Sequence, residues 1–183
     1  MVRWRRRIRR RWRLGELVMI GRLIKHLVYP AWMVRRCFPP DSLQRIESAI
    51  QASEHKHSGE IRFAVESALD LRALLRNEPA RERAIEAFSE LRIWDTEQNN
   101  GVLIYLLLAD RRVEIVADRG LNPHVDEPQW REICKAMEEK FARGAFEQGV
   151  LLGIAEIEKR MIPLFPPRPD DRNELPDRPV ILG

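Results

Sequence analysis

The feature that most restricts the fold is an unbroken apolar run at residues 102–109, VLIYLLLA. Successive side chains of a β-strand point to opposite faces of the sheet, so a run that is apolar at every position is buried on both faces. Asn100-Gly101 precedes the run, and the charged triplet Asp110-Arg111-Arg112 follows it. We therefore predict a central strand with helices covering each face of its sheet.

The neighbours of this run predict the rest of the sheet. Residues 113–117 return after the charged triplet as an antiparallel hairpin partner, and residues 60–66, EIRFAVE, alternate as in a strand with one face in water. A helical pattern lies between this earlier strand and the apolar run, with Ala84 and Phe88 on one side. A connection of that length predicts that the two strands are parallel and that the crossover between them is right-handed.

Helical patterns before and after these strands complete the order αβαββαα. Two helices follow the hairpin, and Asp126 before Pro128 is placed to cap the first of them. The predicted fold class is α/β, a small mixed sheet sandwiched by helices on both faces in three layers, with an N-terminal basic amphipathic helix. A further short strand fits in residues 67–76 or in the tail. The predicted organisation is a leader (1–37), an α/β domain (38–162) and a proline-rich irregular tail (163–183).

The positive charge of the chain belongs to the leader. Residues 1–36 carry twelve Lys/Arg and one acid, whereas the remaining residues carry 20 Lys/Arg against 27 Asp/Glu. A basic protein of this kind is easily taken for a nucleic-acid binder, but the domain itself is acidic. Only two cysteines are present, which excludes a disulfide framework and favours a reducing compartment.

The leader is open to three interpretations. It is a basic amphipathic anchor on an anionic membrane surface, a nucleic-acid contact, or a solvated extension whose helix packs on its own domain. The interleaved tryptophans favour lipid, and the predicted membrane-binding residues are Trp4, Arg5, Arg6, Arg7, Arg9, Arg10, Arg11 and Trp12. Neither a clear signal peptide nor a transmembrane helix is recognisable, so the expected location is the cytoplasm, peripheral at the inner face of the membrane.

Polar residues flank the strands on one side of the sheet. If the first two strands are parallel and the third is their hairpin return, these residues converge on one rim. The set is Glu60, Asp95, Glu97, Asn99, Asn100, Asp118 and Arg119. Carboxylate and amide oxygens suit Ca²⁺ or Mg²⁺, and we assign Glu60, Asp95, Asn99, Asn100 and Asp118 as candidate metal ligands. The other interpretation is that the Asp and Asn residues only form turns and caps.

The element order and the motif around the apolar run resemble the TPM-domain family. The motif is Asn99-Asn100-Gly101, the apolar strand, the charged triplet, and a following strand that ends near Gly120-Leu121. The resemblance covers about residues 38–162 and implies a three-layer α/β fold, with acid phosphatase activity in some members and calcium binding in some bacterial ones. The chain departs from the family at the end of the third strand, where Asp118-Arg119-Gly120 stands in place of a Gly-Tyr-Gly-like sequence.

Three functions follow as hypotheses. The first is a membrane-surface-associated accessory module that binds an unidentified protein partner and Ca²⁺. The second is a metal-assisted acid phosphatase acting on phosphomonoesters, with Asp118 and Arg119 as candidate catalytic residues, because an arginine fork beside a cation can hold a phosphate. Nucleic-acid binding through the leader is a minor third. No organic cofactor is expected.

Overall fold

The structure is a computed structural model that describes residues 20–170 and 172–183. Its core is a four-stranded sheet in the order β3-β2-β1-β4. The strands are β1 (Glu60–Glu66), β2 (Gly101–Leu107), β3 (Arg112–Ala117) and β4 (Val180–Leu182). β1 is parallel to β2 and β4, and β3 runs antiparallel to β2. The parallel pair and the hairpin confirm the predicted topology, and β4 places the extra strand in the tail.

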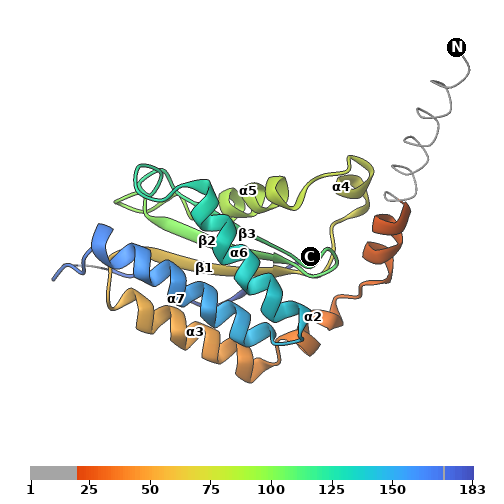
Figure 1. Cartoon of the computed structure of the whole chain (residues 1–183), viewed down its shortest axis with the longest axis horizontal. Helices are drawn as coiled ribbons and strands as arrows, with labels where there is room; N and C mark the ends of the chain where they lie inside the picture. Colours follow the sequence, from red (N-terminus) through yellow and green to blue (C-terminus); the bar gives the residue numbers. More distant parts are fainter. Residues whose placement is uncertain (1–19, 171) are drawn as a thin grey trace, which may run out of the picture.

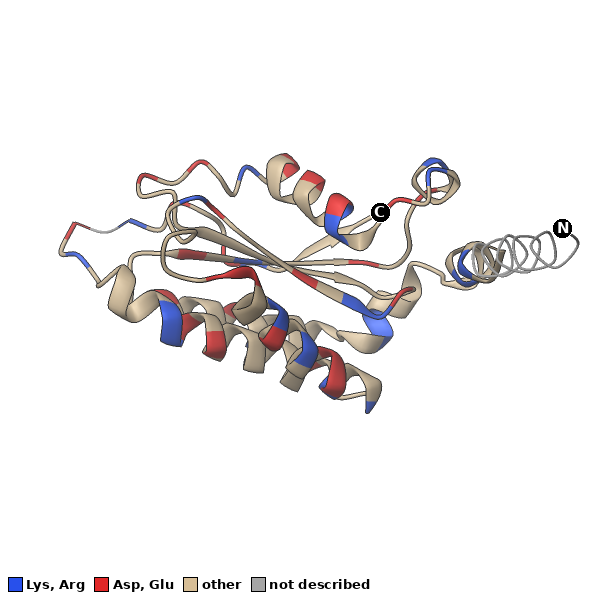
Figure 2. Cartoon of the chain, turned by 45° about the horizontal axis from the view of Figure 1, so that its top comes forward, with Lys and Arg blue, Asp and Glu red and all other residues tan. Residues whose placement is uncertain are grey.

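Helices cover the sheet on both faces, which confirms the predicted three-layer α/β class (Figure 1, Figure 2). On one face lie α3, α6 and α7, and on the other lie α4 and α5. Their bounds are α3 (Pro40–Glu54), α4 (Leu71–Leu75), α5 (Ala80–Glu90), α6 (Glu127–Ala142) and α7 (Phe146–Leu164). Residues 67–76, where a strand was an option, instead hold α4. At the start of α6, Asp126 is the N-cap, as predicted, and its side chain accepts from the backbone N–H of Gln129 in a capping box.

Burial of β2 on both faces is complete. Each of residues 102–108 is at most 1% exposed, with alternate side chains packed in the two core clusters. The prediction that one face of β1 is wet is wrong, because all seven residues of β1 are buried. Glu66 is buried with a partner, since Arg83 on α5 donates its Nε–H at 2.9 Å and the Tyr105 hydroxyl on β2 also donates.

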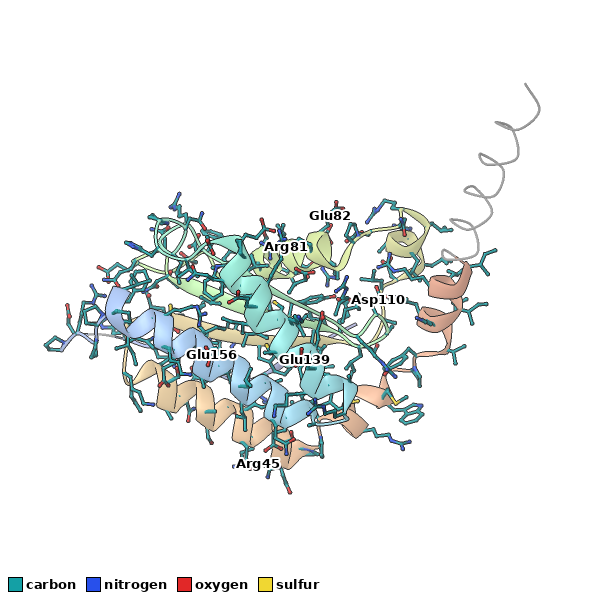
Figure 3. All side chains as sticks on the ribbon, viewed as in Figure 1. Arg45, Arg81, Glu82, Asp110, Glu139 and Glu156 are labelled. Carbon is teal, nitrogen blue, oxygen red and sulfur yellow. The ribbon has the colours of Figure 1, made fainter. Side chains whose placement is uncertain are left out.

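A helical segment at residues 20–28 and α2 (Trp32–Cys37) precede the domain. The segment is fastened to the β2–β3 turn, where Arg22 Nη2 lies 2.8 Å and His26 Nε2 lies 3.0 Å from the carboxylate of Asp110. Figure 3 shows Asp110 at the end of the sheet that faces this segment. Burial alone would raise the pKa of Asp110, but the hydrogen bonds from Arg22 and His26 hold this pKa below its usual range. His26 Nδ1 also accepts from the backbone N–H of Leu69, so both ring nitrogens are used.

Candidate functional site

The N-terminal ends of β1 and β2 and the C-terminal end of β3 meet at one rim of the sheet. Glu60 pairs in register with Gly101, and the backbone N–H of Asp118 donates to the Gly101 carbonyl at 2.9 Å. The segments 96–100 and 118–120 therefore lie side by side at this rim, which we call the strand rim. Asp110 occupies the opposite end of β2.

Asn99 and Arg119 join the two segments of the strand rim. Arg119 Nε donates to Asn99 Oδ1 at 2.8 Å, and the backbone N–H of Gly120 donates to the Asn99 carbonyl at 2.9 Å. A Cβ on Gly120 would meet the carbonyl oxygens of Asn99 and Gln98 at 2.5 and 2.7 Å. Two backbone carbonyls thus crowd against Gly120, and only glycine allows this approach.

Asn100 is fully buried and makes specific contacts through its amide. Its Nδ2 donates to the Ser58 carbonyl at 2.7 Å and to Gln98 Oε1 at 3.2 Å, and its backbone N–H donates to Thr96 Oγ1 at 3.1 Å. The amide orientation leaves Asn100 Oδ1 buried without a hydrogen-bond partner. An acceptor in this position loses its hydration without replacement, which is costly unless a donor or a cation satisfies it.

Asp118 presents a second oxygen of the same kind. Its Oδ1 accepts from the backbone N–H of Arg119 at 2.7 Å, but its Oδ2 is buried with no hydrogen-bond partner. The strand rim therefore holds two acceptor oxygens without partners, one amide and one carboxylate, on neighbouring segments.

These oxygens define what kind of cation fits. In the described part of the chain, no group of three or more His, Cys, Asp or Glu side chains is arranged to hold a metal ion. A Zn²⁺-type cage is therefore not formed by these residues. Asn100 Oδ1 and Asp118 Oδ2 are each of the oxygen type that Ca²⁺ accepts. Asp118 stands opposite Gly101 in the strand register, so Asn100 and Asp118 direct their side chains to opposite faces of the sheet.

Two of the predicted ligands are placed differently from the rest. The carboxylate of Glu60 accepts from the backbone N–H groups of Glu174 and Leu175 at 2.9 and 3.2 Å, so it binds the tail. Burial raises the pKa of Glu60 to about 7, even though these two donors act to lower it. Asp95 is exposed in the turn that follows α5. The strand rim thus joins Asn99, Asn100, Asp118 and Arg119, whereas Glu60 binds the tail and Asp95 lies exposed outside this set.

A pocket beside the strand rim was not predicted. It measures about 470 Å³ and lies between the end of α3, the start of β1 and the tail. Glu54 and Asp177 line it, and Arg62 lies close by with its Nε and Nη1 buried and without hydrogen-bond partners. Burial, together with the nearby carboxylates of Glu60 and Asp177, raises the pKa of Glu54 to about 9. Nothing in the local sequence signals this cluster, because the tail that completes it lies far along the chain.

A serine and a histidine also meet near this pocket. Ser53 Oγ and His57 Nε2 are 3.1 Å apart, but the two residues are 1% and 0% exposed. His57 Nδ1 accepts from the backbone N–H of Gly59, and burial lowers the pKa of His57. The neutral imidazole is satisfied on both nitrogens, so the pair closes the turn after α3 and does not present a nucleophile to solvent.

The predicted membrane-binding residues, Trp4 to Trp12, lie outside the described residues. Among the residues that are described, none of the helices combines the length and the apolar character needed to cross a bilayer. The prediction that the leader (1–37) is a membrane anchor stays a prediction.

Comparison with known proteins gives consistent results. A model of the TPM domain matches residues 35–160. The BA42 protein from the psychrophilic bacterium Bizionia argentinensis, solved by NMR, is 30% identical, with a TM-score of 0.68 over 78% of this chain and 93% of that one. The N-terminal domain of a protein from P. gingivalis is 17% identical, with a TM-score of 0.54 over 72% and 87% of the two chains, and shares the fold. No curated protein gives a significant match.

Proposed function

The chain belongs to the TPM-domain family, and from this we propose that it is an accessory module that binds Ca²⁺ at the strand rim and acts at an anionic membrane surface. The observation that carries the cation claim is the buried carboxylate oxygen without a hydrogen-bond partner, Asp118 Oδ2. A hard cation on Asp118 Oδ2 would supply the partner that this oxygen lacks, and the carbonyls of Gln98 and Asn99 on the facing segment are ligands of the same type. Mg²⁺ is the weaker candidate, because it demands a stricter octahedral geometry and gives up its water reluctantly.

Calorimetric titration of the full chain with CaCl₂ is expected to show binding that Asp118→Asn weakens by about tenfold or more. The substitution keeps the shape of the side chain but removes the charge that attracts the cation, and affinity for Ca²⁺ depends on the charge of its ligands. Saturation with Ca²⁺ should also raise the melting temperature of the wild type, because the cation binds only the folded chain.

Asp95→Asn is the matched control for this titration. It removes the same charge from an exposed turn residue outside the joined set, so its affinity should stay within about twofold of the wild type. Absence of any heat with the wild type removes the cation claim. Equal losses in Asp118→Asn and Asp95→Asn would mean that the overall acidic charge attracts the ion without a built site.

The phosphatase alternative receives less support from the same rim. Metal-assisted hydrolysis needs a cation, an activated water and a group that holds phosphate, and Arg119 is the residue placed for the last role. Arg119 Nε donates to Asn99 Oδ1, which uses one of the five N–H donors of its guanidinium. The Ser53–His57 contact is buried and cannot serve as a nucleophile pair.

We expect the full chain with Ca²⁺ or Mg²⁺ to leave p-nitrophenyl phosphate unhydrolysed across acidic pH, because no activated nucleophile reaches solvent at the rim. A colorimetric assay with Asp118→Asn and Arg119→Ala as companions checks this. Hydrolysis that both substitutions abolish would replace the accessory role with metal-assisted phosphomonoester hydrolysis. Hydrolysis that neither substitution alters would point to another site or a contaminant.

The proposed membrane binding rests on the basic leader. We also propose that the same module binds a protein partner. Phosphate groups of lipid and of nucleic acid are both attracted by arginine, so charge alone does not separate these ligands. Exposed apolar surface does separate them, because it gains free energy in a bilayer and not along a phosphate backbone.

A further inference from the structure

The helical segment 20–28 is amphipathic, but it turns its polar side toward the protein and its apolar side toward solvent. Its polar residues Arg22 and His26 point into the protein, where they hold Asp110, while only Leu23 joins the core. Its large apolar residues face outward: Ile20, Ile24, Leu27 and Val28 are 52%, 54%, 68% and 71% exposed. A helix docked on a water-soluble domain normally turns its apolar stripe inward.

The same end of the molecule carries more exposed apolar side chains. α4 lies beside the segment, because Leu69 before α4 donates to His26 and Asn77 after α4 accepts from Arg22. Leu71 and Leu75 on α4 are 55% and 70% exposed. Figure 1 shows both helices at the end of the molecule opposite the strand rim.

Together with Trp32, which is 57% exposed, these residues form what we call the apolar end surface: Ile20, Ile24, Leu27, Val28, Trp32, Leu71 and Leu75. It gathers seven of the eleven large apolar residues that are exposed in the described part of the chain. Exposed apolar residues scattered singly are ordinary, whereas a concentration on three helical segments at one end of the molecule marks an interaction surface.

The charges around this surface are those of a membrane-binding face. Residues 20–37 contain four Lys/Arg and no acid, and Lys25, Arg35 and Arg36 are exposed. Arg72 on α4 is also exposed, and eight arginines precede the segment within residues 1–13. Long basic side chains beside an apolar stripe reach lipid phosphates while the stripe enters the acyl region.

We propose that the apolar end surface docks on an anionic lipid bilayer, with Ile24, Leu27 and Val28 inserted below the headgroups and the neighbouring Lys and Arg on the lipid phosphates. The inference rests on the membrane part of the proposed function and gives it a contact surface in the folded chain. It also sets an orientation: Asp110 and the docked segment face the membrane, and the strand rim at the other end of β2 faces away from it.

Flotation of the full chain with vesicles tests the inference. Vesicles of phosphatidylcholine with about one third phosphatidylglycerol should carry the wild type, and pure phosphatidylcholine should carry much less. The combined variant Ile24→Gln, Leu27→Gln, Val28→Gln is expected to lower the bound fraction by about tenfold or more, because it removes the inserted apolar groups. All three positions are exposed, so the fold is retained.

Two further variants test whether the loss of vesicle binding is specific to the apolar end surface. The matched control Ile85→Gln, Trp94→Gln, Ile162→Gln changes three exposed apolar residues elsewhere and should bind within about twofold of the wild type. Replacement of Arg5, Arg6, Arg7, Arg9, Arg10 and Arg11 with glutamine should weaken binding and make it less dependent on salt, with the effect of the combined variant still visible.

The outcomes separate the two levels of the proposal. Wild-type binding by the combined variant overturns the apolar end surface, while the membrane role through residues 1–13 and the cation site stand. Failure of the wild type to bind either vesicle overturns both membrane claims but not Ca²⁺ binding, which the calorimetric titration reports separately. A wild-type dimer that the combined variant turns into a monomer, without vesicle binding, assigns the surface to a second copy of the chain and also overturns the inference.

Discussion

Replacing Gly101 with alanine is expected to destabilise the fold by about 3 kcal/mol, since forced overpacking in a rigid interior costs this order of free energy. An added Cβ would lie 2.2 Å from the Ile93 carbonyl oxygen and 2.8 Å from Ile93 Cγ2. Ile93 is fully buried, and its backbone N–H is bonded to the Phe88 carbonyl, so it has no room to retreat. Urea unfolding followed by circular dichroism measures the loss.

Gly21→Ala is the control for this substitution. No atom lies within 4 Å of a Cβ on Gly21, and the residue sits in an exposed helical segment, where alanine is favoured over glycine. Its stability should equal or slightly exceed that of the wild type. If Gly101→Ala instead unfolds at the wild-type urea concentration, the close approach of β2 to the end of α5 is wrong, and with it the position of Asn100.

The apolar run and its flanking residues predict most of the fold, because the constraints that they impose are local. A strand that is apolar at every position admits only a two-sided burial, and Asn99 and Arg119 are brought together by the register of a single hairpin. The same reasoning failed for β1. Its polar residues look solvent-facing in the sequence, yet Glu66 is paired with Arg83, and Glu60 is held by the backbone of the tail. The alternation of polar and apolar residues along a strand shows which side chains are polar. It does not show whether a polar side chain is exposed to water or is buried with a hydrogen-bond partner.

The tail explains why the candidate site was only partly predictable. Glu174 and Leu175 contact Glu60 across more than a hundred residues of sequence, and no periodic pattern marks such contacts. The sequence therefore predicts Glu60 as a cation ligand, whereas in the structure its carboxylate accepts hydrogen bonds from the backbone of the tail. The orientation of segment 20–28 was hidden for a similar reason: its apolar stripe is visible in the sequence, but only the position of Asp110 shows which side faces inward.

The tail contact also predicts how stability depends on pH. Glu54 and Glu60 have pKa values raised by burial to about 9 and about 7, and they face Asp177 and Arg62. In the unfolded chain both glutamates lose their protons near pH 4.3. Between that pH and the folded pKa values, the folded state holds more protons than the unfolded state, so the free energy of unfolding falls as pH rises. The stabilisation is complete below about pH 4.3 and is lost through pH 7 to 9.

Glu54→Gln should therefore raise the free energy of unfolding at pH 8 by about 2 kcal/mol and change it little at pH 5, because each unit of pKa shift is worth about 1.4 kcal/mol and solvent screens part of the shift. Glutamine keeps the acceptor oxygen for the backbone N–H of Ile61, which Glu54 Oε1 holds at 2.8 Å, and removes the charge. Thermal unfolding between pH 5 and pH 9 measures the slope. Glu47→Gln, at a half-buried position on α3 outside the pocket, is the control and should keep the wild-type slope. An unchanged slope in Glu54→Gln would mean that Glu54 is already ionised at neutral pH, and that Arg62 supplies the compensating charge within the folded chain.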